Sequence, residues 1–492
     1  MIPGENTSPP LPEPRNLRQR RRLPPVSAVP RPFIWLIISF AFWYDRWESL
    51  IPPLALLRVS GLVTYAMTLW FFLKGDKAIL RREPLVIYCT AFVLLMILSC
   101  TFAVQDGVFY LTRNMFLIVF GGVAPLVSLV TTWDRTLRLF KYWVAINLYV
   151  AVWAILHHGR GTGDFLLDEN DLALAMAMAF PYGLYLRSLS SATPAWRLVY
   201  NLAPWACVLA VVISFSRGGF VGLIGVSAAV WILSKRKLRI ALVTAAVVGT
   251  GVSAGSLVTK LLPNGYIARV QSATNPDQST RVERLQSWQV GWIMWKHNPI
   301  FGTGAGQFPW NVDKYEPLAS FWVNRAKSRD YQGRQVHSLY FALLSEMGLA
   351  GAAVFLLLVG TIVTTLARII AREKRYAARA PPAEGVVDAV RIQDQALLAK
   401  AMLCSLAGFL SSGTFISVLY YPHIWLLAGF AAALKNTSCM ADGGESPPQS
   451  RAKPRRRFAR SHRRVRLRIK GSARPSASAR RRLPQDSQYP TS

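Results

Sequence analysis

The amino-acid sequence predicts an all-α protein, a polytopic membrane helix bundle of about 12 transmembrane helices with one long extracytoplasmic loop that contains interfacial helices. Hydrophobic residues make up 52% of the 492 residues, and the mean hydropathy is +0.27. Long apolar stretches recur from Phe33 to Leu434, and only one polar gap between them is large. Lys and Arg gather in alternate loops, which is typical of a chain that crosses a membrane many times.

The apolar stretches are close to the length of a membrane crossing, because the hydrocarbon core takes about 20 residues of helix. Their density leaves no room for a separate soluble domain before residue 260. The approximate span cores are residues 33–44, 51–73, 85–104, 115–131, 142–157, 172–187, 200–215, 218–233, 239–259, 338–367, 395–418 and 420–435.

Basic residues orient these spans, since short loops rich in Lys and Arg stay on the cytoplasmic side. One set of alternate loops is strongly basic and comprises Arg15 to Arg22, Lys74 to Arg82, Arg135 to Lys141, Arg187 with Arg197, Lys235 to Arg239, Arg368 to Arg379 and the C-terminal tail. The short loops of the other set are acidic or contain few Lys and Arg residues. This set includes residues 45–48, 164–171, 260–337 and 420–421. We therefore expect both termini to be cytoplasmic and the long segment to lie outside.

This topology divides the chain into five segments. They are a disordered cytoplasmic N-terminus (1–32), transmembrane helices 1–9 (33–259), an outer loop with an interfacial helix (260–337), transmembrane helices 10–12 (338–435) and a basic, disordered cytoplasmic tail (436–492).

The formal net charge of +32 is typical of a nucleic-acid binder, but its distribution favours a membrane surface. The tail carries 15 Lys and Arg between Arg451 and Arg482 with no acidic residue among them. No fold for reading bases is visible, so we predict contacts with membrane lipids and no nucleic-acid partner.

Metal and disulfide chemistry have little support in the sequence. The five cysteines are scattered, and neither a disulfide framework nor a zinc site is indicated. Asp164 to Asp171 offer carboxylates that suit a divalent cation, but such groups in an exposed loop are usually only solvated. We therefore predict no metal and no cofactor.

The outer segment contains one clear helical pattern, over residues 281–297. Its apolar residues at helical spacing are Leu285, Trp288, Trp292 and Trp295. Charged residues lie between them, which favours a helix along the membrane interface, with Thr280 as its N-cap and Pro299 as its stop. Gly302, Gly304 and Gly306 then indicate a tight turn.

Arg217 is the first of three basic groups that this topology places at the outer edge of the membrane. It stands between two apolar runs, with Ser216 before it and Gly218 after it. A guanidinium there is costly unless it faces water, a partner or an anion, and the glycines allow a ligand to approach the backbone. An anchor that reaches the interface is an equally good interpretation.

Arg281 and Arg284 form the second group, at the start of the predicted interfacial helix. They lie on neighbouring faces, and a helix N-terminus attracts anions. A solvated, charged helix face is the simpler alternative.

His337 and Ser338 form the third group and open the tenth predicted span, with Glu346 and then Gly348 and Gly351 beyond them. An imidazole titrates near neutral pH and can act as a general base. A lone His at a membrane edge is more often structural, and the glycines alone indicate a helix contact.

Together these groups resemble the O-antigen ligase/polymerase superfamily of bacterial envelope enzymes. The stretches that carry the resemblance are Ser216-Arg217-Gly218-Gly219-Phe220, Arg284-Leu285-Gln286-Ser287-Trp288 with the later Asn298 to Phe308, and His337-Ser338 followed by Gly348 and Gly351. Their order and separation are also those of the family, and they cover about residues 216–351.

The resemblance implies a GT-C-type glycosyltransferase of the bacterial inner membrane. Its donor would be a glycan on undecaprenyl pyrophosphate at the periplasmic face, its acceptor lipid A-core or a comparable lipid or glycan, and its reaction inverting and independent of metal. Arg217 and Arg284 would bind the pyrophosphate and His337 would take the proton of the acceptor hydroxyl. Arg281 competes with Arg284, because it has the family's Arg-x3-Leu spacing with Leu285.

The resemblance also implies a wider substrate-binding set, which comprises Arg281, Ser216, Gly218, Ser338, Gly304 and Glu346. One departure is the Arg-x3-Val spacing after Arg217, which leaves the role of the arginine itself intact.

Four functions remain open at this point. A ligase and a repeat-unit polymerase share the same chemistry and differ only in the acceptor. A protein O-oligosaccharyltransferase is a third member of the same group. A membrane transporter belongs to a different class, and the sequence shows neither an ionisable pair in mid-span nor matching interrupted helices in its two halves.

Overall fold

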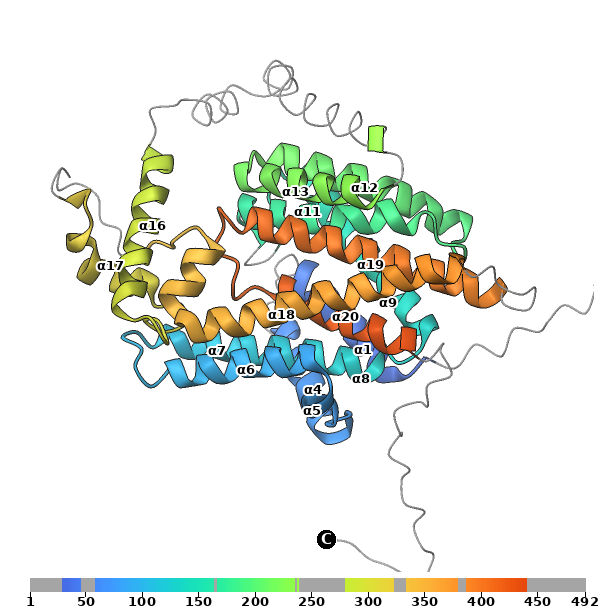
Figure 1. Cartoon of the computed structure of the whole chain (residues 1–492), viewed down its shortest axis with the longest axis horizontal. Coiled ribbons are helices and arrows are strands. Elements are labelled where there is room, and N and C mark those ends of the chain that lie inside the picture. The colour runs from blue at the N-terminus through green and yellow to red at the C-terminus, as the bar shows by residue number, and fades with distance from the viewer. Residues whose placement is uncertain are drawn as a thin grey trace, which may run out of the picture. The chain divides into compact units, whose positions relative to one another are not determined.

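The computed structural model describes residues 29–45, 58–162, 166–234, 237–238, 279–322, 333–378 and 386–439. These residues form helices and connecting loops without a strand, which confirms the predicted all-α class (Figure 1). Nearly all of the two predicted disordered termini, and the predicted span at 239–259, lie outside the described residues.

The helices are α1 (Arg31–Asp45), α4 (Val59–Lys74), α5 (Ile79–Arg82), α6 (Pro84–Ser99), α7 (Gly107–Leu117), the π-helix η1 (Ile118–Val123), α8 (Ala124–Leu129), α9 (Trp133–Leu156), α11 (Glu169–Leu186), α12 (Pro194–Ser214), α13 (Arg217–Leu233), α16 (Ser279–His297), α17 (Phe308–Tyr315), the 3-10 helix η2 (Glu316–Leu318), α18 (Leu339–Ala378), α19 (Val386–Ser412) and α20 (Pro422–Cys439).

Several helices are apolar enough to lie in a membrane, so the chain is built as an integral membrane protein. Among the described residues, five stretches are also long enough to cross one: Gly107–Leu129, Trp133–Leu156, Pro194–Ser214, Leu339–Ala378 and Asp388–Ser412. Shorter apolar helices are Arg31–Trp43, Val59–Lys74, Pro84–Ser99 and Arg217–Leu233. Eleven of the predicted cores fall on helices, while the total of about 12 spans stays a prediction.

Some helices run well beyond the predicted apolar cores. α9 begins at Trp133 rather than near residue 142, and α18 extends to Ala378 rather than 367. At the start of α9 the side chains of Asp134 and Arg138 form an ion pair at 2.9 Å, one helical turn apart. Charged turns of this kind continue a helix past its apolar part, because hydropathy marks the membrane core and not the end of the backbone hydrogen bonding.

The segment predicted to lie outside the membrane holds more structure, over its described residues, than the sequence predicted. α16 covers the expected interfacial helix, although it begins at Ser279, so that Thr280 lies inside it rather than capping it. α17 and η2 follow the glycine turn and were not predicted. Trp288 and Val290 of α16, Phe308 and Val312 of α17, and Phe341 of α18 share one apolar cluster.

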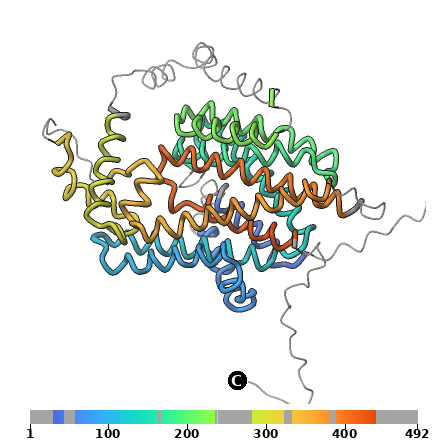
Figure 2. The backbone as a smooth tube through the Cα atoms, viewed as in Figure 1, coloured from blue at the N-terminus to red at the C-terminus, as the bar shows by residue number. Residues whose placement is uncertain are grey.

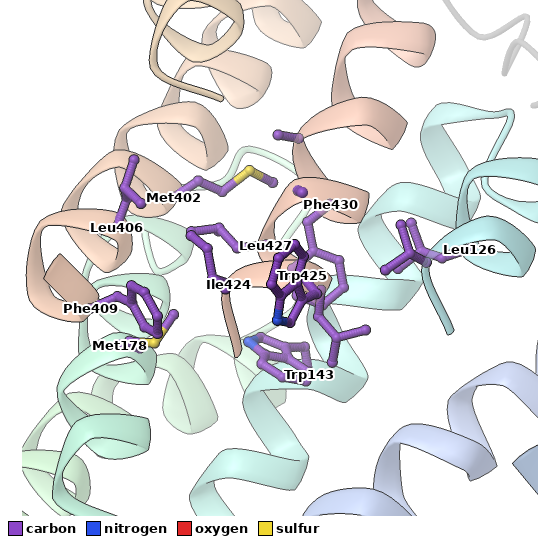
Figure 3. Close-up of a cluster of buried hydrophobic side chains, with 14 of the residues drawn as sticks. Leu126, Trp143, Met178, Met402, Leu406, Phe409, Ile424, Trp425, Leu427 and Phe430 are labelled. Carbon is purple, nitrogen blue, oxygen red and sulfur yellow. The ribbon is translucent and has the colours of Figure 1, made fainter. Parts of the chain in front are cut away.

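α20 is the central helix of the bundle. It contacts α6, α8, η1, α9, α18 and α19, and Trp425 is completely buried. The ring of Phe430 meets that of Trp143 edge-on, with 5.0 Å between their centroids, and Figure 3 shows these side chains within the packed core. α18 also lies beside α6, so segments far apart in the sequence are neighbours (Figure 2).

Polar contacts join the basic loops at one end of the bundle. Lys435 pairs with Glu83 at 2.6 Å, and the guanidinium of Arg372 donates to the Ser438 carbonyl at 2.7 Å. The Ser190 hydroxyl donates to Asp394 at 2.7 Å. The residues before α6 and α12, the N-terminal part of α19 and the end of α20 therefore lie at this end. The starts of α11, α13, α18 and α20 lie at the opposite end.

Candidate active site

The candidate site is built on the starts of α11 and α13. Asp168 caps α11, with its carboxylate accepting from the backbone N–H of Asn170 at 2.8 Å. Ser216 caps α13, with its hydroxyl oxygen accepting from the backbone N–H of Gly219 at 3.1 Å. The two starts are joined, because the Ser216 hydroxyl donates to the side-chain oxygen of Asn170 at 2.8 Å. Two helix N-termini thus offer their partial positive charge side by side.

Arg217 is the first residue of α13, and its side chain is exposed. The chain turns sharply from α12 into α13 through Phe215, which adopts a φ of 52°. This turn places the guanidinium at the helix N-terminus. A cation gains nothing from the helix dipole there, so its position suits a bound anion better than the helix itself.

Arg284 approaches the same place from α16. The ring of Trp288, one turn later, stacks on Phe341 of α18 at 5.3 Å between centroids and lies 5.9 Å from Phe415. Burial lowers the pKa of Arg284, the positive charge of Arg217 lowers it further, and the carboxylate of Asp168 opposes both. The two arginines therefore lie within electrostatic reach of each other.

His337 lies two residues before the start of α18 and adopts a φ of 52°. Its side chain keeps a solvent-exposed edge, yet the surrounding protein removes enough water to lower the pKa of the imidazole. The positive charge of Arg284 lowers that pKa further, and Asp168 opposes the shift. The neutral imidazole, which is the form that accepts a proton, is therefore favoured.

Three of the sequence-predicted residues are thus brought together, since Arg284 interacts with both Arg217 and His337. Asp168 belongs to the same cluster, although the sequence placed it only in an acidic loop considered for metal binding. Arg334, which pairs with Glu283 at 3.5 Å, lies beside His337 as well. The side chain of the competing Arg281 lies outside the described residues.

Glu346 forms hydrogen bonds with three groups of the protein itself. It is buried in α18, and its carboxylate accepts from the Tyr420 hydroxyl at 2.7 Å and from the backbone N–H groups of Gly306 at 3.0 Å and Phe308 at 3.1 Å. These bonds hold the glycine turn against α18, where Gly348 breaks the helix with a φ of 60°. They favour a structural role over the predicted contact with substrate.

Four other predicted substrate-binding residues are also enclosed by protein. Gly304 donates its backbone N–H to the Glu346 carbonyl at 2.9 Å. Gly218 is buried where a Cβ atom would lie 3.0 Å from Ile416, and Ser338 is buried just before α18. Ser216 is buried and caps α13. In this structure these four shape the backbone around the charged residues.

Fold and site together define an integral membrane protein with a cationic and imidazole-bearing site at one end of its helices. Residues 202–356 match the family described as O-antigen ligase, which confirms the resemblance over this segment. The matched segment includes Arg217, Arg284 and His337. No curated protein matches the chain. Within the described part of the chain, no group of three His, Cys, Asp or Glu side chains is arranged to hold a metal.

Proposed function

We propose that this protein transfers a glycan from undecaprenyl pyrophosphate to a hydroxyl of lipid A-core or a similar acceptor, at the periplasmic face of the inner membrane. The O-antigen ligase segment supports a glycosyltransferase of this general type. The observation that carries the proposal is the electrostatic cluster of Arg217, Arg284 and His337 beside two helix N-termini.

The arginines act on the leaving group. As the acceptor oxygen bonds to the anomeric carbon, the bond from that carbon to the phosphate oxygen breaks, and negative charge grows on the departing lipid pyrophosphate. Arg217 and Arg284 stabilise this charge, and guanidinium groups suit phosphate because they present several donors in one plane. Their mutual repulsion, which lowers the pKa of Arg284, is relieved when the dianion binds between them.

His337 acts on the acceptor. Its neutral ring accepts the hydroxyl proton as the oxygen attacks, and it becomes an imidazolium. Attack from the face opposite the leaving group inverts the anomeric configuration. The reaction as proposed needs no metal, because the cations that balance the pyrophosphate are side chains.

A repeat-unit polymerase is the closest alternative, since it would use the same donor site and the same base. The two differ in the acceptor, which is a second lipid-linked glycan in the polymerase. The described residues favour neither, because the groups in the cluster act on the diphosphate and on a hydroxyl that both reactions share.

The test is a reaction of the purified protein with a glycan on undecaprenyl pyrophosphate and, separately, each candidate acceptor. We expect an acceptor-linked glycan of inverted anomeric configuration and release of undecaprenyl pyrophosphate. Longer lipid-linked glycans formed without any added acceptor would identify a polymerase. If the protein consumed no donor with either class of acceptor, the proposal would be contradicted.

A further inference from the structure

Asn170 lies in the first turn of α11 and contacts the residue that precedes Arg217. Its side-chain oxygen accepts the Ser216 hydroxyl proton at 2.8 Å. The same hydroxyl oxygen accepts from the Gly219 backbone N–H at 3.1 Å. One hydroxyl therefore caps α13 and ties it to α11 at the same time.

A second contact clamps the same turn of α13. Gly219 lies so close to Ala173 of α11 that a Cβ atom on the glycine would collide with the Cβ of Ala173. Arg217 stands between the hydrogen-bonded Ser216 and this tightly packed Gly219. The position of its backbone relative to α11 is therefore fixed from both sides.

The bond to Asn170 does more than a helix cap requires. Capping α13 needs only the bond from Gly219 to Ser216, which satisfies one of the N–H groups left open at a helix start. The additional bond joins α13 to the turn that carries Asp168. That carboxylate is an electrostatic neighbour of both Arg284 and His337. The link thus ties Arg217 to the rest of the cluster.

We propose that Asn170 is a positioning residue for Arg217, which through Ser216 holds the arginine at the distance from Arg284 and His337 that a lipid diphosphate requires. This inference rests on the proposed function, because it assigns Asn170 to the same diphosphate site. Displacing a binding group by about 1 Å costs up to about 100-fold in rate.

The experiment compares Asn170→Leu, Arg217→Ala and the double variant in the full-length protein. Leu has nearly the size of Asn but no acceptor, so it removes the link and leaves the cap of α13 in place. The readouts are kcat and KM for the lipid-diphosphate donor and the inhibition constant of inorganic pyrophosphate. Ser190→Ala is the matched control, because it removes a side-chain bond of 2.7 Å between Ser190 and Asp394 at the other end of the bundle.

We expect Asn170→Leu to lower kcat/KM for the donor by about 10-fold to 100-fold and to weaken pyrophosphate inhibition. In the Arg217→Ala background the same change should add little, because the group that it positions is already absent. Ser190→Ala should lower the melting temperature about as much as Asn170→Leu does. It should leave kcat, KM and the inhibition constant of pyrophosphate unchanged. Asn170→Ser, which is too short to reach Ser216, serves if the Leu variant does not accumulate.

Wild-type kinetics in Asn170→Leu, or a loss that adds fully to that of Arg217→Ala, would overturn the positioning role. The two proposals fail differently. Full transfer and normal pyrophosphate inhibition in Arg217→Ala would show that Arg217 does not bind the diphosphate, which would refute the proposed function. An inactive Arg217→Ala beside a fully active Asn170→Leu would remove only the role of Asn170.

Discussion

His337 has a backbone conformation that residues other than glycine rarely adopt. Phe215, two residues before Arg217, shares it, and so does His158, whose neighbour Gly159 packs against Ser214. Three of the four non-glycine residues with positive φ in the described chain therefore lie at the candidate site or in the loops that pack against it. Such strain persists only where the surrounding structure enforces it, and it sets the direction of the side chains that carry the proposed chemistry.

The charge around His337 predicts two opposite pH shifts. Arg334 lowers the pKa of His337 and Glu283 raises it. A base works in its neutral form, so the rate falls as the pH drops through that pKa. Arg334→Gln should raise the pKa and move the acid limb of kcat/KM to higher pH, whereas Glu283→Gln should move it to lower pH. Arg334 and Glu283 pair with each other, so each variant serves as the control for the other. Shifts in the same direction would remove His337 as the titrating base.

Only part of the site could be predicted at the residue scale. Arg217, Arg284 and His337 stand out because each lies in a stretch that resembles the O-antigen ligase/polymerase superfamily. Asp168 and Asn170 could not be recognised, because their roles depend on the starts of α11 and α13 lying side by side. Asn170 and Ser216, which join these starts, are 46 residues apart in the sequence. A polar residue before a helix indicates a cap, and only the tertiary contact makes it part of a site.

At the scale of elements, the glycine turn is held by side-chain hydrogen bonds between the loop that joins α6 to α7 and the helix α18. The Gln307 side-chain oxygen accepts from the backbone N–H groups of Val104 at 3.0 Å and Gln105 at 2.9 Å, while Glu346 binds the turn from α18. Both polar side chains are buried and satisfied, which makes each costly to alter. The resemblance implied that Glu346 contacts substrate, because it follows His337 in the matching stretch. The sequence alone does not show that its carboxylate is buried.

Replacing Glu346 tests this structural role. Glu346→Gln places an amide N–H where the carboxylate now accepts, so one of its three donors loses its partner. We expect a loss of about 1–3 kcal/mol in stability, measured as a lower melting temperature in detergent. Glu373→Gln is the control, because its pair with Lys400 at 2.7 Å is partly exposed and is worth about 1 kcal/mol at most. An unchanged melting temperature with lost donor binding would restore Glu346 to the substrate site.

The docking of α16 sets the position of Arg284. Trp288→Ala removes the ring stacking on Phe341 of α18 and the contact with Phe415. We expect faster hydrogen exchange in α16 and a KM for the donor that rises by about 10-fold, since the arginine loses its support. Trp292→Ala is the matched control, because its side chain is 41% exposed. Equal effects of the two variants would contradict the role of Trp288.

At the scale of the whole molecule, polar contacts gather at both ends of the bundle. The contacts of Lys435 with Glu83 and of Arg372 with Ser438 lie at one end, and the candidate site lies at the other. The alternation of basic loops predicts that these two ends face opposite sides of the membrane, because crossing a bilayer forces successive loops to opposite sides. α17 and the exact helix ends were not predictable, because they depend on tertiary packing rather than on hydropathy.

Cysteine labelling tests which end faces outward. In a cysteine-free background, Gln335→Cys lies beside His337 and Lys77→Cys lies between α4 and α5, and both positions are exposed. We expect an impermeant thiol reagent to label residue 335 in intact inner-membrane spheroplasts and residue 77 only after permeabilisation. The reverse pattern would place the candidate site in the cytoplasm.

The proposed function depends on Arg217, Arg284 and His337 acting as one catalytic cluster. The most direct measurement is glycan transfer by the purified Arg217→Ala, Arg284→Ala and His337→Ala proteins at matched abundance, with Ser190→Ala as the control. The account predicts that each of the three loses at least about 100-fold in kcat/KM while the control keeps the wild-type rate. A wild-type rate in His337→Ala or Arg217→Ala protein would contradict it.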